Sequence, residues 1–205
     1  MSSPARRVAG VILAAGEARR FGSQKLLATL EGRPLVQHVI DAANASSLSD
    51  VVLVIGADAE RILARVRLGR ARAVLNADFA SGQASSLRAG LRAVSGADAA
   101  CVLLGDVPRV TSALIEALIE RQRDTGAPAV LSRVAGRRTP PALLHRDLWP
   151  AADALEGDVG MREVLAGRSD GAEVEVTDAL GALDDVDTRE DHARLDGAPS
   201  GKAAR

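Results

Sequence analysis

A segment rich in small residues and cations, LAAGEARRFGSQK, occupies residues 13–25 directly after an apolar run. The backbone at its start carries little or no side chain, so it can approach a ligand closely and direct its N–H groups at an anion. The residues concerned are Ala14, Ala15 and Gly16. Arg19, Arg20 and Lys25 follow and add positive charge. This arrangement predicts a site for a polyphosphate.

Two common nucleotide-binding motifs do not fit the segment. A Walker A loop needs four residues between its glycines and a Lys-Ser/Thr pair directly after them, but five residues separate Gly16 from Gly22, and Ser23 and Gln24 precede Lys25. The dinucleotide pattern G-x-G-x-x-G is also missing. The alternative is a solvated loop with incidental charge. Lys25 favours a functional loop, because 24 of the 26 Lys and Arg residues are Arg and a lysine supplies a compact point charge.

Acidic residues follow another apolar run and gather near the C-terminus. Asp106 ends CVLLGD, where a strand of a parallel sheet would place a ligand of Mg²⁺, although an Asp-x-Pro turn is an equal alternative on these residues alone. Asp184, Asp185 and Asp187 crowd together in LDDVD. Their spacing alone does not choose between them.

Apolar runs alternate with helical patterns along the first two thirds of the chain. The runs read as strands that are buried on both faces, and they cover residues 8–14, 51–57, 99–105 and 127–133. The helical patterns cover residues 34–45, 58–69 (with a cap at Asp58) and 111–122. This alternation predicts an α/β fold, a single-domain, Rossmann-like three-layer sandwich with a mostly parallel, doubly wound sheet.

The last third is less regular. Residues 139–150 begin with prolines, which predicts an edge strand. Residues 172–177 alternate like a strand, and residues 187–195 predict a short helix. We expect one domain over residues 1–195 and a flexible tail over residues 196–205.

Composition narrows the classes of partner. The net charge of −1 and the near absence of aromatic residues argue against nucleic acid as a ligand. No apolar segment approaches the ~20 residues of a membrane span, and we find no targeting sequence. The single cysteine, Cys101, lies in an apolar run and excludes a disulfide framework, so we expect a core residue and a cytoplasmic protein. His38, His145 and His192 form no metal cluster in the sequence.

The segment LAAGEARRFGSQKLL resembles the signature of the nucleotidyltransferases that share the molybdenum cofactor guanylyl/cytidylyltransferase fold. Further segments resemble the branch of molybdenum cofactor cytidylyltransferases. They are EGRPLVQHVI, NADFASGQASSLRAGL, LLGDVP, ALEGDVGMREVL and DVDTRED. The similarity runs from about residue 8 to about residue 195.

The resemblance implies a Mg²⁺-dependent transfer of CMP from CTP to a phosphorylated acceptor, molybdopterin or its metal complex, with release of pyrophosphate. It gives Arg20 and Lys25 catalytic roles at the triphosphate and makes Asp106 and Asp187 the metal ligands. The nucleotide-binding residues that it implies are Leu13, Ala14, Ala15, Gly16, Gly82 and Ser86. The acceptor-binding residues are Gly157, Asp158, Gly160 and Arg162. Ala at the third position of Leu-Ala-Ala-Gly implies CTP, since guanylyl-transferring members have Gly there.

Some positions depart from the family or keep a structural alternative. Ser86 could hydrogen-bond a base or ribose, or belong to a Ser-rich helix cap. Met161 and Arg189 stand where relatives have Ala and Pro, and Thr139-Pro140 replaces a Gly followed by His or Asn. The acceptor could therefore be a sugar phosphate, a polyol phosphate or phospholactate. A third reading is a non-catalytic module that delivers cofactor to a molybdenum hydroxylase.

Overall fold

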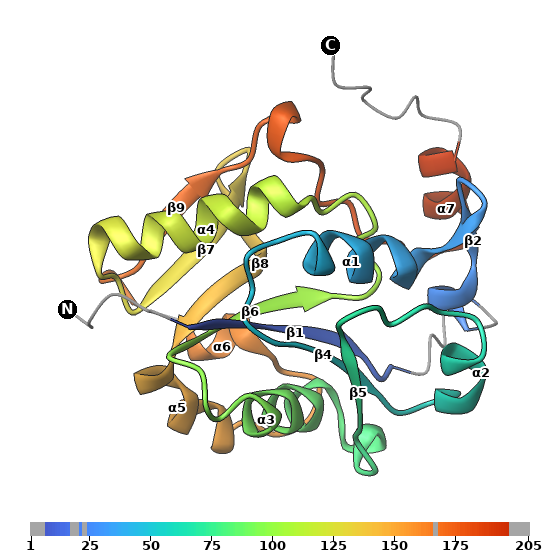
Figure 1. Cartoon of the computed structure of the whole chain (residues 1–205), viewed down its shortest axis with the longest axis horizontal. Helices are drawn as coiled ribbons and strands as arrows, with labels where there is room; N and C mark the ends of the chain where they lie inside the picture. Colours follow the sequence, from blue (N-terminus) through green and yellow to red (C-terminus); the bar gives the residue numbers. More distant parts are fainter. Residues whose placement is uncertain (1–6, 17–20, 22–23, 166–167, 197–205) are drawn as a thin grey trace.

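The computed structural model describes residues 7–16, 21, 24–165 and 168–196, and its centre is a seven-stranded sheet. The strands follow the order β5-β4-β1-β6-β8-β7-β9 (Figure 1). They are β1 (Val8–Ala14), β4 (Val51–Ile55), β5 (Arg72–Leu75), β6 (Ala99–Leu104), β7 (Ala129–Val134), β8 (Arg137–His145) and β9 (Ala172–Glu175). A separate antiparallel pair, β2 (Thr29–Leu30) and β3 (Arg33–Pro34), lies apart from this sheet.

The predicted mostly parallel sheet is confirmed. Strand β1 runs parallel to both β4 and β6, and all seven of its residues are buried. Strand β5 pairs in parallel with β4 at one edge and was not predicted. It is only four residues long and its two terminal residues, Arg72 and Leu75, are exposed, so it lacks the continuous apolar run of a central strand.

Helices cover both faces of the sheet, which confirms the predicted three layers (Figure 1). Helices α1 (Leu35–Asn44) and α4 (Ser112–Thr125) pack on one face and share a core cluster with Ile12 of β1. Helices α3 (Gln83–Ala93), α5 (Trp149–Asp153) and α6 (Met161–Val164) pack on the other, with Val11. Successive residues of β1 therefore enter opposite cores, as strand geometry requires.

Helix α2 (Ala59–Leu63) is shorter than the predicted helix over residues 58–69. The side chain of Gln37 explains the early end. Its amide oxygen accepts a hydrogen bond from the Arg67 N–H at 2.7 Å, and its NH₂ group donates to the Arg67 carbonyl at 3.0 Å. That backbone is thereby held outside a helix. Asp58 does stand at the predicted N-cap position, but it has a φ of 55° and its side chain makes no capping hydrogen bond; its carboxylate pairs with Arg61 instead.

The predicted edge position of residues 139–150 is wrong, because β8 lies between β6 and β7 and runs antiparallel to both. The β7–β8 register jumps from Leu131↔Ala142 to Ser132↔Thr139, so Pro140 and Pro141 fall in the irregularity. Pairing with β6 begins only at Ala142. An interior strand thus tolerates two prolines, because at this irregularity neither proline needs to donate a backbone hydrogen bond to a neighbouring strand.

The C-terminal part ends in β9 at the far edge of the sheet and in helix α7 (Arg189–Asp196). Both elements were predicted. Residue 196, the first of the predicted tail, still belongs to α7, and residues 197–205 lie outside the described residues. Within the described part of the chain, no helix combines the length and apolar character that crossing a membrane requires.

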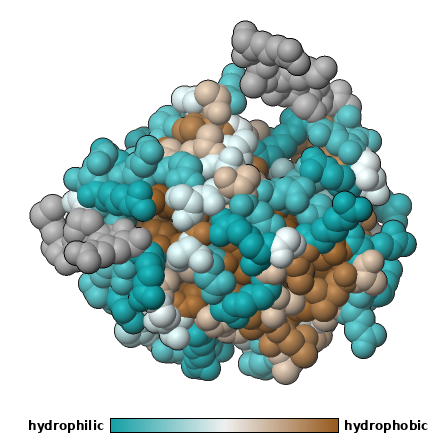
Figure 2. Space-filling model, viewed as in Figure 1, coloured by the Kyte–Doolittle hydropathy of each residue, from teal (hydrophilic) through white to brown (hydrophobic). Residues whose placement is uncertain are grey.

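The surface is hydrophilic over much of the face drawn in Figure 2 and more apolar toward the side where α2 and β5 lie. Leu63 at the end of α2 and Leu75 at the end of β5 are exposed, Leu75 by 65%. Scattered exposed apolar residues are normal on a protein surface.

Candidate functional site

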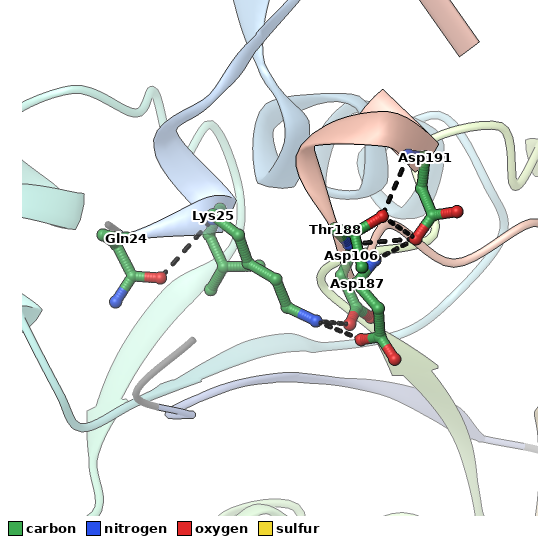
Figure 3. Close-up of polar contacts among 7 residues, drawn as sticks. Gln24, Lys25, Asp106, Asp187, Thr188 and Asp191 are labelled. Carbon is green, nitrogen blue, oxygen red and sulfur yellow. Dashed lines mark hydrogen bonds and ion pairs between the residues drawn. The ribbon is translucent and has the colours of Figure 1, made fainter. Parts of the chain in front are cut away.

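The ammonium of Lys25 lies between two carboxylates that come from distant parts of the chain. Lys25 Nζ is 2.6 Å from Asp106 Oδ2 and 2.9 Å from Asp187 Oδ1 (Figure 3). The three side chains are 17%, 18% and 30% exposed, so water screens these pairs less than it would screen pairs on an open surface. The structure therefore brings together three of the residues that the sequence and the resemblance singled out.

Local structure fixes Lys25 at the end of the cationic loop. Lys25 begins a short 3₁₀ helix, η1 (Lys25–Leu27), and the Gln24 side chain accepts a hydrogen bond from the Leu26 backbone at 3.4 Å. Leu26 is buried in the core, which anchors the turn. Arg20, the other predicted catalytic cation, and Arg19 lie outside the described residues.

A backbone contact and a small apolar cluster bring Asp187 to Asp106. The Val186 N–H donates to the Asp106 carbonyl at 3.1 Å, so the acidic segment runs beside the end of β6. Val186 is fully buried, and it packs in a cluster with residues from the N-terminal part and from α7. The other members are Phe21, Leu30, Leu35 and Leu195.

A reciprocal cap at the start of α7 fixes the backbone of Asp187 (Figure 3). Asp191 Oδ2 accepts from the Thr188 N–H at 2.9 Å, and Thr188 Oγ1 accepts from the Asp191 N–H at 3.1 Å. The Asp187 N–H also donates to Asp191 Oδ2, at 3.3 Å. This is the geometry of a capping box with Asp at its third position. The hydrogen bonds from the Thr188 side chain and backbone lower the pKa of Asp191.

Arg189, which departs from the family pattern, contacts the cationic loop. Its guanidinium lies 5.9 Å from the centre of the Phe21 ring, and its Nε donates to the Phe21 carbonyl at 3.4 Å. A cation over an aromatic face is a favourable contact. The substitution thus adds a link between α7 and the loop that precedes Lys25.

Charge balance around Lys25 favours the ammonium. Burial disfavours a charged group and lowers the pKa of Lys25, but Asp106 and then Asp187 more than offset this through charge and hydrogen bonding, so its pKa is raised above the usual value. Among the described residues, two carboxylates surround this one ammonium. A divalent cation would find complementary charge there.

A cavity of about 610 Å³ opens beside this cluster. Every residue predicted to bind the nucleotide lines it: Leu13, Ala14, Ala15, Gly16, Gly82 and Ser86. Backbone hydrogen bonds hold its floor, because the Leu13 carbonyl accepts from Gly105 at 2.9 Å and the Ala15 carbonyl from Ala57 at 3.2 Å. Lys25, Asp106 and Asp187 form part of the same wall.

Gly82, which the resemblance makes a nucleotide-binding residue, also lies close to protein backbone. Gly82 has a φ of 107°, and a Cβ there would lie 2.2 Å from the carbonyl carbon of Gly157. The glycine therefore lets the start of α3 pack against the loop around residue 157, and the Ala84 N–H donates to the Gly157 carbonyl at 3.1 Å. This contact brings Asp158 to the mouth of the cavity.

A second cavity, of about 630 Å³, adjoins the first. The two share Leu13, Gln83, Leu104 and Asp158 in their walls. Of the residues predicted to bind the acceptor, Asp158, Gly160 and Arg162 line the second cavity, and Gly157 lines the first. The departing pair Thr139-Pro140 also lines the second cavity.

Asp185 lines the second cavity, whereas Asp187 contacts Lys25. Partial desolvation, and then the like charges of Asp187 and Asp106, raise the pKa of Asp185. Sequence reasoning missed two other residues of this region, Arg138 and Gln83. Gln83 follows Gly82 directly, so the motif itself pointed to it. No sequence motif pointed to Arg138. Its place at the second cavity depends on β8 lying inside the sheet, whereas the sequence predicted an edge strand.

The donor set at Lys25 fits Mg²⁺ or a similar hard cation. Asp106 and Asp187 offer carboxylate oxygens around one point, and magnesium sites often combine one or two carboxylates with water and substrate phosphates. Across the described residues, no group of three or more His, Cys, Asp or Glu residues could form a protein-only metal cage. Metal binding by Asp106 and Asp187 stays a prediction.

The chain matches a known protein family. Residues 10–174 match the MobA-like NTP transferase domain, which is most of the chain. This chain belongs to that family. It is therefore a nucleotidyltransferase, and the predicted fold and class of enzyme are confirmed.

Relatives of this chain carry varied names. The chain is 33% identical to nicotine blue oxidoreductase of Paenarthrobacter nicotinovorans over 170 residues, which cover 77% of this chain and 81% of that protein. Other relatives are much longer: the chain spans 26% of the bifunctional protein GlmU of Sinorhizobium fredii, at 37% identity over 57% of this chain. The name of a relative therefore does not fix the substrate.

Solved structures of the same fold include two mycobacterial proteins. The Rv0371c homologue from Mycobacterium sp. strain JC1 is 30% identical, with a TM-score of 0.80 over 92% of this chain and 94% of that one. Rv0371c of Mycobacterium tuberculosis, solved in complex with manganese, is 27% identical, with a TM-score of 0.75 over 92% of this chain and 97% of that one.

Proposed function

We propose that this nucleotidyltransferase moves CMP from CTP to a phosphorylated acceptor, molybdopterin or its molybdenum complex, and releases pyrophosphate. The observation that carries the proposal is the ammonium of Lys25 between Asp106 and Asp187, on the wall of a cavity floored by residues 13–16. Small-residue backbone, a fixed ammonium and two carboxylates are the groups that a triphosphate and its metal ion require.

The reaction needs positioning and charge more than proton transfer. A terminal phosphate oxygen of the acceptor attacks the α-phosphorus of CTP, and the bond from that phosphorus to the β-phosphate oxygen breaks. The attacking oxygen is already anionic near neutral pH, so no general base is needed. Lys25, joined by Arg20, holds the triphosphate and stabilises the charge that grows on the leaving pyrophosphate. The nucleophile is the acceptor itself, so no covalent enzyme intermediate forms.

Asp106 and Asp187 are the residues of this chain that would hold Mg²⁺. The bound ion supplies positive charge to the phosphate oxygens. Support comes from the donor chemistry of the two carboxylates and from the manganese complex of the mycobacterial relative. Because the carboxylates now contact Lys25, we expect the ammonium to move toward the phosphates when the metal ion and CTP bind.

The two adjoining cavities suit two substrates. We assign CTP to the first and the acceptor to the second, which Asp158, Gly160 and Arg162 line, with Gly157 beside them on the first. The walls that the cavities share would place the attacking phosphate beside the α-phosphorus. Reactive atoms held at such close range account for a large part of the rate enhancement in many enzymes.

CTP is favoured over GTP by the resemblance, which associates Ala at position 15 with cytidylyl transfer. Ala15 lines the first cavity but is only 3% exposed, and a Cβ on Gly56 would lie 3.0 Å from the Ala15 methyl carbon. The methyl group thus packs against Gly56 within the cavity wall, and we expect Ala at this position to leave less room for a two-ring base than Gly would. We further propose a cytoplasmic location and a molybdenum hydroxylase as the recipient of the product.

Pyrophosphate release measured with a panel of acceptors tests the proposal. The panel contains molybdopterin, a sugar phosphate, a polyol phosphate and phospholactate, each with CTP and Mg²⁺. We expect release only with the pterin. Pyrophosphate release with another acceptor would show that the acceptor has been misassigned, while the nucleotidyl transfer itself would stand. Tight pterin binding without release would favour the cofactor-delivery module.

A further inference from the structure

Asn76 lies at the end of edge strand β5 and contacts two serines at the start of α3. It is buried, and its N–H donates to the Ile55 carbonyl at 2.8 Å, which fixes its backbone beside β4. Its side-chain Nδ2 lies 2.8 Å from Ser85 Oγ and 3.1 Å from Ser86 Oγ. Only Ser86 of these three residues lines the first cavity.

The orientation of the Asn76 amide is set by the backbone. The Asp78 N–H donates to Asn76 Oδ1 at 3.1 Å, and a backbone N–H cannot accept a hydrogen bond. The amide oxygen therefore faces Asp78, and the NH₂ group faces the two hydroxyls. Since an amide NH₂ only donates, both hydroxyl oxygens must accept from it.

Each serine then has one hydroxyl hydrogen left to donate, and the two serines differ. Ser85 Oγ lies 2.9 Å from the Asp78 carbonyl and 2.8 Å from the Gly82 carbonyl, so its hydrogen is used within the fold. Among the described residues, the structure gives Ser86 Oγ no acceptor of this kind. Its hydrogen is left for an acceptor atom in the cavity.

We propose that Asn76 is a positioning residue that makes Ser86 a hydrogen-bond donor to the nucleotide. The inference rests on the proposed function, in which CTP fills the first cavity. Its ligand is an acceptor atom of the pyrimidine, a carbonyl oxygen or an unprotonated ring nitrogen. A hydroxyl that is free to rotate could serve a donor or an acceptor, whereas this one is restricted to acceptors.

Two substitutions at Asn76 separate this role from simple space filling. Asn76→Asp keeps the size of the side chain but replaces the NH₂ donor by an acceptor, so the Ser86 hydrogen turns toward position 76 and away from the ligand. Asn76→Ala removes the side chain and frees the hydroxyl. We expect the dissociation constant for CTP to rise about tenfold in Asn76→Asp and about threefold in Asn76→Ala, the range of one neutral hydrogen bond.

Isothermal titration with CTP and Mg²⁺ measures these constants without an acceptor. If Asn76 only fills space, Asn76→Ala would weaken CTP more than Asn76→Asp, which would overturn the inference. Ser85→Ala is the matched control, because Ser85 contacts the same amide but lies outside the cavity walls. We expect Ser85→Ala to lower Tm and to leave the CTP constant within twofold.

A double-mutant cycle shows whether Asn76 acts through Ser86. In a Ser86→Ala background, Asn76→Asp should change the CTP constant less than twofold, because the hydroxyl it redirects is gone. An equal loss in both backgrounds would overturn the inference. Wild-type protein that binds no nucleotide would overturn the proposed function as well. If folded Asn76→Asp binds CTP as tightly as the wild-type protein does, the role of Asn76 is overturned and the proposed function stands.

Discussion

Lys25 and Asp106 are 81 residues apart in the chain, yet the Lys25 ammonium lies 2.6 Å from an Asp106 carboxylate oxygen. The contact joins the end of the cationic loop after β1 to the end of β6, because β1 and β6 are parallel neighbours whose carboxyl ends meet at one edge of the sheet. Ligands of open α/β folds bind at this edge. The predictions below test what each member of the cluster does there.

Replacing Lys25 should impair catalysis strongly. We expect Lys25→Ala to lower kcat with CTP at least about tenfold, since a charge-assisted hydrogen bond is worth ~1.5–3 kcal/mol and ~1.4 kcal/mol corresponds to tenfold in rate. The other lysine of the sequence, Lys202, provides the control as Lys202→Ala. Circular dichroism should show an intact fold in both variants. Full activity in Lys25→Ala would remove this side chain from the mechanism.

The carboxylates should differ in their importance for the metal ion. Asp106→Asn and Asp187→Asn should each reduce activity severely and raise the Mg²⁺ concentration that half-saturates it, because an amide carries no charge. Asp185→Asn should have a much smaller effect, since Asp185 lies on the second cavity. Manganese binding followed by electron paramagnetic resonance gives a second reading. An exchange of these effects between Asp185 and Asp187 would show that the metal ligand has been misassigned.

The base preference should depend on Ala15. We expect wild-type protein to use CTP in preference to GTP, and Ala15→Gly to narrow the ratio of their kcat/KM values without abolishing turnover. Discrimination by a methylene-sized group is roughly 1–3 kcal/mol, or about 10–200-fold. Lys25, Asp106 and Asp187 remain in place in this variant. A wild-type preference for GTP, ATP or UTP would reject the cytidylyl assignment but keep the nucleotidyl transfer.

Cys101 should report on opening of the core. Burial, and then the negative charge of Glu116, raise the pKa of this thiol to about 12. The thiol therefore stays protonated and covered at pH 8, so it should not react with a disulfide reagent until the protein unfolds. CTP with Mg²⁺ should slow the reaction further, because ligands that bind only the folded state stabilise it. Rapid labelling of native protein at pH 8 would contradict this burial.

The sequence predicted the central strands and edge strand β9, but it missed edge strand β5 and placed β8 wrongly at an edge. Strands β1, β4 and β6 are buried on both faces, so each is a continuous apolar run. Strand β5 escaped notice because it is short and partly exposed. The prolines of β8 suggested an edge, since sequence alone does not show that a register jump opposite Ser132 removes the need for their N–H groups.

Those residues of the candidate site that directly follow a central strand could be predicted, because the end of the strand determines where they lie. Small residues after β1 and Asp106 after β6 follow from the rule for parallel sheets. The choice of Asp187 over its acidic neighbours came from the resemblance, because its contact with Lys25 spans 162 residues and depends on the packing of Val186 and the cap of α7. The role of Asn76 depends on the orientation of one amide, which no sequence pattern records.

Isotopically labelled CTP tests the central claim most directly. CTP carrying ³²P at the α-phosphorus, or in a parallel reaction at the γ-phosphorus, is incubated with the protein, Mg²⁺ and molybdopterin, and the products are separated. Nucleotidyl transfer predicts that the α-label moves to the pterin and that the γ-label appears only in pyrophosphate, with both signals formed at least about tenfold more slowly in Lys25→Ala. A γ-label on the pterin, or oxidation and reduction without any release of pyrophosphate, would contradict the account.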